Sequence, residues 1–475
     1  MKRPVVLLAT ALVAVIAVAP APAGAGTGVS KVARDAAALT SCAWPVQSTP
    51  AKANVFYPDA NATYWTMPFA VGRGLTVTIA GAFPNARYFS VQVYNALAQN
   101  YTAPVYGTSA ISDYQLTPDG GAVNPWQTAV AAGTTAGTYT VTVSDTAPAG
   151  TANLLPLPPT VRSGISGIDA TVGFLMIRVY LPDGSDDDPA VVPLPPVTFS
   201  GPTGRAVTLQ PCASAQTAPS AQSQIKKAAV KQALNKALAG TDAAPAAPVC
   251  TKKQAGCAPS LQFFKAGLSA TPFPNASSKY VAALYTRNAA YATVVKATMP
   301  TSATAAGDSP AVWNPTGPTQ LRYWSICSYL HQPPYPVIRA ASVNGCLADE
   351  QLAAGASGGT AYAVLTVPSK RPTSTVTSAK QPQVGWLPVS TASTSAAGLV
   401  AVRNMLPSAA LPYALGPTPT TDPAAAQTAM GAYYPQIAQC LLTTFNSAAA
   451  AAGGGQTGAV AGVNACFANP ASPPS

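Results

Sequence analysis

The sequence predicts an all-β protein made of two tandem antiparallel β-sandwich domains, jelly-roll-like in character, that arose by internal duplication. Three observations support this prediction. Segments that alternate apolar and polar residues recur along the chain, clusters of Gly, Pro and Asn separate them, and several short motifs occur twice in the same order. Because period-two alternation buries one face of a strand and leaves the other in water, such segments suit a sandwich.

The chain begins with the pattern of a secretory signal peptide, residues 1–25. A basic pair precedes an apolar run from Val5 to Ala19, and the small residues around Ala25 match a signal-peptidase site. The run is shorter than the roughly 20 residues that span a bilayer as a helix. We therefore expect cleavage after Ala25 and a secreted or extracytoplasmic protein with no membrane span, beginning with a flexible segment over residues 26–41.

The first sandwich is expected over residues 42–212. Its strands should be the alternating, β-branched segments between turn clusters. These segments are Leu75–Ile79, Tyr88–Tyr94, Thr138–Val143 and Phe174–Tyr180.

The second sandwich is expected over residues 261–407, because this part repeats five motifs of the first in the same order. The motifs are an Arg-Tyr-x-Ser segment, an Asp-x-Gln-Leu turn, a strand after a Gly-containing turn, a Leu-Pro step, and Gly, Arg and Pro at equal spacing. Their copies are Arg87–Ser90 and Arg322–Ser325, Asp113–Leu116 and Asp349–Leu352, Tyr139–Val143 and Tyr362–Leu365, Leu155–Pro156 and Leu387–Pro388, and Gly173–Pro182 and Gly398–Pro407.

Residues 213–260 read as an Ala/Lys-rich linker, and residues 408–475 as a partly helical, low-complexity tail. In the linker, Ile225–Ala239 has helical spacing of its apolar residues. This helix either touches an anionic envelope surface or simply joins the domains, and we favour the second reading. Much of the net charge of +11 lies on this linker. Because a nucleic-acid binder gathers basic residues on a folded face among aromatics, we expect no nucleic-acid partner.

Eight cysteines in an exported chain indicate a disulfide framework. A metal site is not favoured, because no Cys-x-x-Cys spacing occurs and the chain has one histidine. We expect neither a metal nor a cofactor. The expected bridges are Cys42–Cys212, Cys250–Cys257, Cys327–Cys346 and Cys440–Cys466.

The order of these motifs resembles a group of uncharacterised exported bacterial β-sandwich proteins. It is more distantly similar to the jelly-roll domain of unknown function numbered twelve-fourteen. The resemblance covers Tyr88 to Phe199 and, more loosely, Leu321 to Pro407. It implies a fold and transfers no known chemistry.

The charged residues that recur in both halves are the strongest candidates for a site. In a chain this poor in charge, a buried Arg178 requires a partner, and Asp113 is the natural acceptor. One reading is an Arg–Asp network that pins the strands within each sandwich. The other is a cleft that binds an anionic or sugar ligand. The repeated residues are Arg87, Asp113, Arg178, Arg322, Asp349 and Arg403.

Catalytic groups are scarce, with 15 acidic residues and a single histidine in the chain. The leading hypothesis is therefore a non-catalytic module that binds envelope or extracellular polysaccharide. Aromatic residues in turn-rich regions could stack on sugar rings. One alternative is a secreted hydrolase with a site near His331, Asp349 and Glu350, and another is a structural surface component. The aromatic candidates are Tyr57, Tyr64, Trp65, Tyr101, Tyr106 and Trp126.

Overall fold

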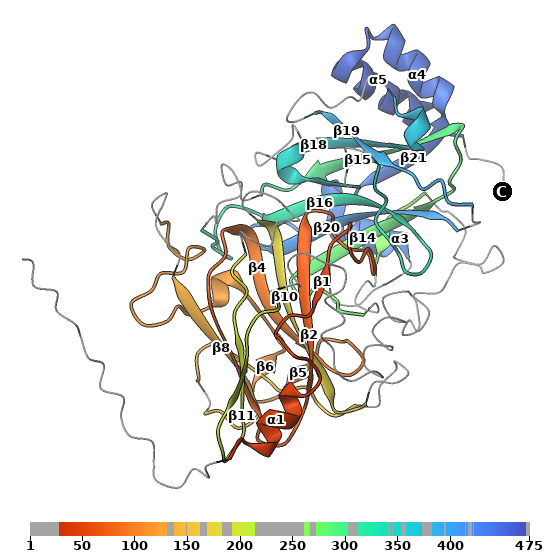
Figure 1. The fold of residues 1–475 in the computed structure, drawn as a ribbon. Helices are drawn as coiled ribbons and strands as arrows, with labels where there is room; N and C mark the ends of the chain where they lie inside the picture. The colour runs from red at the N-terminus through yellow and green to blue at the C-terminus, as the bar shows by residue number, and fades with distance from the viewer. Residues whose placement is uncertain are drawn as a thin grey trace, which may run out of the picture.

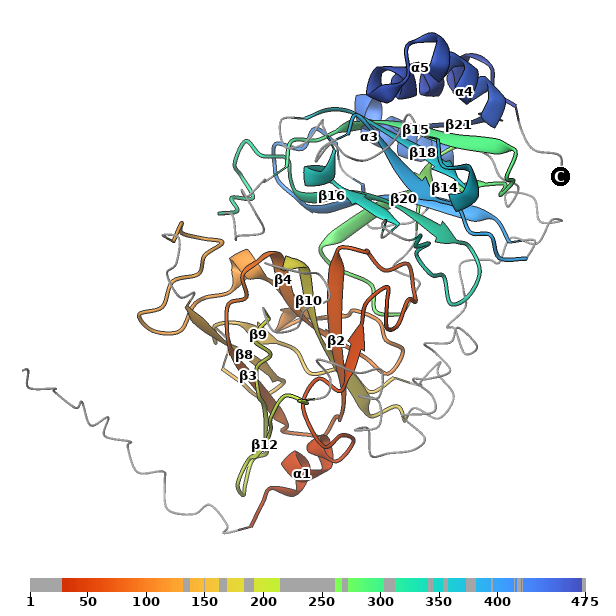
Figure 2. The same ribbon diagram turned by 45° about the horizontal axis from the view of Figure 1, so that its top comes forward.

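The computed structural model consists of two β-sandwiches that pack against each other through one sheet of each (Figures 1 and 2). The N-terminal half, coloured red to yellow, forms the lower sandwich in Figure 1, and the C-terminal half, green to blue, forms the upper one. The structure describes residues 28–130, 137–148, 150–161, 169–182, 192–213, 261–266, 272–302, 312–340, 343, 345–352, 358–372, 382–393, 396–413, 415–416, 420 and 422–471.

The first sandwich contains two five-stranded sheets, with strand orders β1-β2-β10-β4-β7 and β12-β11-β3-β8-β9. A short hairpin, β5 with β6, lies outside them. The strands are β1 (Val46–Ser48), β2 (Ala62–Ala70), β3 (Thr76–Ala82), β4 (Ala86–Tyr94), β5 (Thr102–Ala103), β6 (Gly107–Thr108), β7 (Ala110–Ser112), β8 (Thr138–Ser144), β9 (Leu154–Leu155), β10 (Val172–Pro182), β11 (Val197–Ser200) and β12 (Val207–Leu209).

The two sheets differ in how their strands are buried. In β3, Val77 and Ile79 enter the core while Thr76 and Thr78 are partly exposed, as alternation predicts. In β4 and β10, by contrast, every residue is buried. Their second face is covered by the other sandwich, since one apolar cluster joins Tyr88 and Tyr180 of the first half to Tyr323 of the second.

The second sandwich has sheets with strand orders β13-β14-β20-β16-β17 and β19-β18-β15-β21. Its first sheet faces the first sandwich. The strands are β13 (Phe264–Lys265), β14 (Ser278–Tyr285), β15 (Tyr291–Met299), β16 (Leu321–Leu330), β17 (Cys346–Ala348), β18 (Gly359–Thr366), β19 (Val384–Pro388), β20 (Gly398–Pro407) and β21 (Gln436–Leu441).

The two sandwiches share one topology. β1, β2, β10, β4 and β7 take the same order as β13, β14, β20, β16 and β17, and β9, β8, β3 and β11 take the same order as β19, β18, β15 and β21. The strand pairs within the sheets are antiparallel, as expected, except for one in each half, since β8 pairs with β9 and β18 with β19 in parallel. The repeated Leu-Pro step lies at the end of this edge strand, where a residue without an N–H is tolerated: Pro156 directly follows β9, and Pro388 is the last residue of β19.

Segments expected to be irregular are partly ordered. Within residues 26–41, a helix, α1 (Lys31–Ala37), is capped by Ser30 and buries Ala33 and Ala36 against the first sandwich. Beyond Pro407, β21 pairs with β15, so the second sandwich continues past its expected end. The Ala-rich stretch belongs to two packed helices because alanine favours helix. The C-terminal helices are α3 (Pro423–Met430), α4 (Leu442–Ala451) and α5 (Gly455–Ala468).

Three of the four expected disulfides are present. Cys42–Cys212 ties the N-terminal segment to the end of the first sandwich, and Cys327–Cys346 joins directly paired residues of β16 and β17. Cys440–Cys466 ties β21 to α5. Cys250 and Cys257 lie outside the described residues, as do the signal peptide and the linker helix.

In the part of the chain that the structure describes, no helix is long and apolar enough to cross a membrane.

Candidate functional site

The repeated charges meet in the seam between the two sandwiches, and they pair across it. Arg87, at the start of β4, lies with Nη1 3.3 Å from Asp349 Oδ1 and Nη2 2.6 Å from Glu350 Oε2. Arg322, at the start of β16, lies with Nη2 3.0 Å from Asp113 Oδ1. The expectation that the acids pair with arginines of their own sandwich is therefore wrong. Each half supplies the carboxylate for an arginine of the other.

The Asp-x-Gln-Leu motif explains where the carboxylates point. Asp113 begins a 3-10 helix, η1 (Asp113–Gln115), and its carboxylate accepts hydrogen bonds from the N–H groups of Phe89 and Tyr114 at 2.9 and 2.6 Å. The side chain of Gln115 accepts from the N–H of Ser112. The turn thus fixes the carboxylate at the sheet edge, from which it reaches Arg322.

The second copy of the motif repeats this arrangement. Asp349 begins η5 (Asp349–Gln351) and accepts from the N–H groups of Trp324 and Glu350 at 3.4 and 2.9 Å. Gln351 accepts from the N–H of Ala348.

These ion pairs are removed from water. The side chains of Arg87, Asp349, Arg322 and Asp113 are fully buried, and only Glu350 is partly exposed. Burial raises the pKa of Asp113, and Arg322 opposes this shift. Burial likewise raises the pKa of Asp349, with Arg87 opposing it. A charge buried here is tolerated only beside its partner, so each of these ion pairs needs both sandwiches in place.

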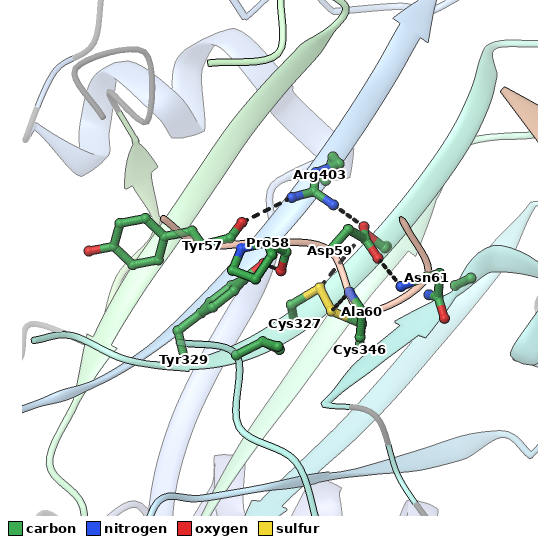
Figure 3. Close-up of a disulfide and its surroundings, with 12 residues drawn as sticks. Tyr57, Pro58, Asp59, Ala60, Asn61, Cys327, Tyr329, Cys346 and Arg403 are labelled. Carbon is green, nitrogen blue, oxygen red and sulfur yellow. Dashed lines mark hydrogen bonds and ion pairs between the residues drawn. A yellow bond between two sulfur atoms is a disulfide. The ribbon is translucent and has the colours of Figure 1, made fainter. Parts of the chain in front are cut away.

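Arg403 has a partner that the sequence analysis missed. Asp59, in the loop before β2, accepts hydrogen bonds from Arg403 Nη1, from the Tyr323 hydroxyl at 3.1 Å and from Ser325 Oγ at 2.7 Å. Figure 3 shows Asp59 between Arg403 and the Cys327–Cys346 disulfide. Asp59 is again an acid of the first half that serves an arginine of the second.

A signal for Asp59 was present in the sequence. The segment Tyr57-Pro-Asp-Ala60 before β2 is matched by Phe273-Pro-Asn-Ala276 before β14. The similarity involves an aromatic residue, Pro and Ala, while the acid itself is replaced by Asn275. A comparison that looked only for repeated charges could not find it.

Arg178 is the exception among the repeated arginines. It is 4% exposed. Its Nη2 donates to the Tyr94 hydroxyl at 2.7 Å and to the carbonyl oxygen of Phe273. Its guanidinium also lies 5.2 Å from the centre of the Tyr64 ring. Within the described residues, no carboxylate forms an ion pair with Arg178.

Arg178 and Arg403 line one cavity in the seam. Its volume is about 70 Å³, and one water molecule needs about 10–15 Å³ of such space. Six of its 17 lining residues are aromatic, among them half-buried Phe273 and Tyr280 on the side of the second sandwich. The other rings that line it are Phe56, Tyr57, Tyr64 and Tyr180.

The aromatic residues proposed for sugar stacking divide into three groups. Tyr57 and Tyr64 line the cavity. Trp65 and Trp126 are buried in the core of the first sandwich, so they cannot present a face to a ligand. The remaining two lie elsewhere and donate hydrogen bonds to carbonyl oxygens; they are Tyr101 and Tyr106.

His331 does not meet the two acids proposed for a hydrolase. It lies seven residues beyond Trp324, whose N–H donates to Asp349. Because a strand rises about 3.3 Å per residue, roughly 20 Å separates His331 from Asp349. His331 instead lies 2.8 Å from the Tyr57 hydroxyl through Nδ1, and burial lowers its pKa to about 4. It is a packed, neutral histidine at physiological pH.

One group of potential metal ligands also lies in the seam. Asp59 Oδ, Cys327 Sγ and Cys346 Sγ lie within 4.8 Å of one another. The two cysteines are bonded to each other, so they offer no thiolate.

The solved structures that are similar to this chain include two bacterial proteins. No protein-family model matches it, and none of the curated proteins matches it. An uncharacterised protein from Burkholderia cenocepacia is similar over 87% of this chain and 86% of its own, with 13% identity and a TM-score of 0.47. A protein from Vibrio parahaemolyticus is similar over 80% of this chain and 89% of its own, with 10% identity and a TM-score of 0.36.

Proposed function

We propose that this chain is an exported, non-catalytic binding protein that holds envelope or extracellular polysaccharide in the cavity between its sandwiches. The observation that carries the proposal is the combination of aromatic walls with two guanidinium groups in one cavity. Ligand sites commonly lie between domains, with apolar and aromatic walls and a few polar groups that orient the ligand. Tyrosine suits a sugar because it offers an apolar ring face and a polar hydroxyl.

The proposal divides the six repeated charges into two classes. Arg87 and Arg322, with Asp113 and Asp349, bind the sandwiches to each other. Arg178 and Arg403 line the cavity, and Arg178 contacts the ligand. We further propose that the two halves arose by duplication, a view that the shared strand order supports. Kinship with the jelly-roll domain named above remains a prediction from the motifs.

Export and a non-catalytic role have separate support. Disulfides persist in oxidising compartments, so the three bridges favour an extracytoplasmic location in keeping with the predicted signal peptide. The distance between His331 and Asp349 supports binding over hydrolysis, because general acid and base groups must both reach one substrate bond.

The test is a sedimentation assay with the oxidised chain, residues 26–475, and insoluble cell-wall and polysaccharide preparations. We expect the protein in the pellet with no sugar released. Soluble sugar in the supernatant would contradict the non-catalytic proposal. Protein that stays in the supernatant with every preparation would contradict polysaccharide binding and leave the structural surface role.

A matched pair of variants locates the site. Tyr280→Ala removes a half-buried ring from the cavity wall, while Tyr291→Ala removes a half-buried ring from β15, in the sheet away from the seam. We expect the first variant to leave the pellet and the second to remain in it. Equal retention of both would place the polysaccharide elsewhere.

A further inference from the structure

The surroundings of Arg178 and Arg403 are two copies of one arrangement. Each arginine lies at the same place in its half, in β10 and β20, and each donates through Nη2 to a backbone carbonyl of the other half. Arg403 donates to Tyr57 at 3.4 Å, and Arg178 donates to Phe273. Tyr57 and Phe273 occupy the same position in the repeated segment before β2 and β14.

The loops that follow are anchored alike. The hydroxyl of Tyr329 donates to the carbonyl of Pro58 at 3.1 Å, and that of Tyr94 donates to the carbonyl of Pro274 at 2.9 Å.

The ends of β10 and β20 bind the residue that lies two positions beyond Asp59 in one copy and two positions beyond Asn275 in the other. Leu181 donates its N–H to Asn61, and Leu406 donates its N–H to Ser277, both at 2.9 Å. Both leucines have a left-handed backbone, with φ of 46° and 45°. These matches establish that Asn275 stands where Asp59 stands in the other copy.

The two copies differ in charge. Asp59 neutralises Arg403. Asn275 is neutral, and its Oδ1 accepts from Gln92 Nε2 at 3.1 Å and from the N–H of Ser277 at 3.0 Å. The second copy therefore lacks the carboxylate that completes the first.

Arg178 consequently carries a buried positive charge that tyrosines surround but no acid in the described chain balances. A guanidinium does not lose its proton in a protein. The Nε atom of Arg178 is buried and has no hydrogen-bond partner. Its Nη1 atom makes no hydrogen bond to a described residue either, but it is not fully buried. Nη1 is therefore accessible where Arg178 lines the cavity.

We infer that the cavity takes an anionic group, which binds Arg178 in place of the carboxylate that Asn275 lacks. This inference rests on the proposed function, and it makes the ligand an acidic saccharide. A uronate carboxylate and a phosphate share the required chemistry, since both give Arg charge-assisted hydrogen bonds. The pairing of Asp59 with Arg403 in the same chain is the internal example of such a bound anion.

The decisive variant is Asn275→Asp, which supplies the missing carboxylate from within. The change keeps size, and the bonds from Gln92 and Ser277 to Oδ1 survive it. Gln210→Glu is the matched control, because it adds the same charge on an exposed side chain directly after β12, a strand of the sheet away from the seam. Titration calorimetry at low salt would measure D-glucuronate, D-glucose and inorganic phosphate with each protein.

For the wild type we expect glucuronate to bind at least about tenfold more tightly than glucose. Asn275→Asp should lose this preference and melt at a temperature no lower than the wild type, while Gln210→Glu should keep it. If inorganic phosphate binds the wild type but not Asn275→Asp, the result would support the anion site at Arg178 and indicate that the ligand is a phosphate-bearing polymer.

Equal binding of the anions to wild type and Asn275→Asp would overturn the anion site, as would a wild type that binds neither anion. The proposed function is judged separately by the pellet and by Tyr280→Ala. Polysaccharide binding that Tyr280→Ala abolishes and Asn275→Asp leaves intact would refute this inference alone.

Discussion

The exchange of carboxylates between the two halves can be measured as a coupling free energy. Asp113 and Arg322 are both fully buried, so removing either one leaves an uncompensated charge and should cost about 3–5 kcal/mol of unfolding free energy. Asp113→Ala also deprives the N–H groups of Phe89 and Tyr114 of an acceptor, at about 1 kcal/mol each. Asp113→Ala should thus destabilise the protein by about 6 kcal/mol, and Arg322→Met by about 4 kcal/mol.

The double variant should lose much less than the sum, because removing both charges leaves none unpaired. We expect a coupling of at least about 2 kcal/mol between Asp113 and Arg322, and additivity within about 0.5 kcal/mol between Asp113 and Arg178. Urea unfolding of the oxidised chain, followed by tryptophan fluorescence, gives the four free energies of each cycle. A larger coupling to Arg178 than to Arg322 would show that the acids pair within their own sandwich, and would refute the exchanged arrangement.

Two further predictions concern pH and the disulfides. Burial lowers the pKa of His331 from 6.5 to about 4, so the folded state resists protonation of this side chain. The unfolding free energy therefore holds its full His331 contribution above pH 6.5 and loses it as the pH falls toward 4. The loss should reach about 3 kcal/mol at pH 4 in the wild type and be absent from His331→Gln. Urea unfolding at pH 7 and pH 4 measures it. An equal change in unfolding free energy between the two pH values in both proteins would contradict this prediction. The Cys42–Cys212 bridge spans 170 residues and Cys327–Cys346 spans 19. Replacing each pair by serine should cost about 5 and about 3 kcal/mol respectively, and the reverse order of melting temperatures would contradict the loop-entropy account.

Strands and the repeat were predictable because they depend on local patterns. Alternation marked β3 and β8, whose outer faces meet water. The Arg-Tyr-x-Ser and Asp-x-Gln-Leu motifs marked equivalent places in both halves. The strand β21 was missed, because its six residues lie between helix-favouring segments and pair with a strand far away in the sequence.

The choice of ionic partner could not be predicted from spacing. Asp113 and Asp349 occupy equivalent places, so the motif allows either acid to serve either arginine. Only the packing of the two sheets decides that each reaches across the seam. Asn275 was harder still to recognise, because it is neutral and matters only as the replacement for the carboxylate that Asp59 supplies at the equivalent position.

The reciprocal pairing in the seam also indicates how the asymmetric site could arise. A contact in which residue i of one copy meets residue j of the other, and j meets i, is the pattern of an isologous twofold dimer. On the proposed duplication, the ancestor was a single sandwich that dimerised through this face. In such a homodimer any change at the position of Asp59 would appear twice and strip both arginines of their acid. Fusion of the two copies in one chain removed that constraint, so that one arginine kept its internal partner while the other became free to hold a ligand.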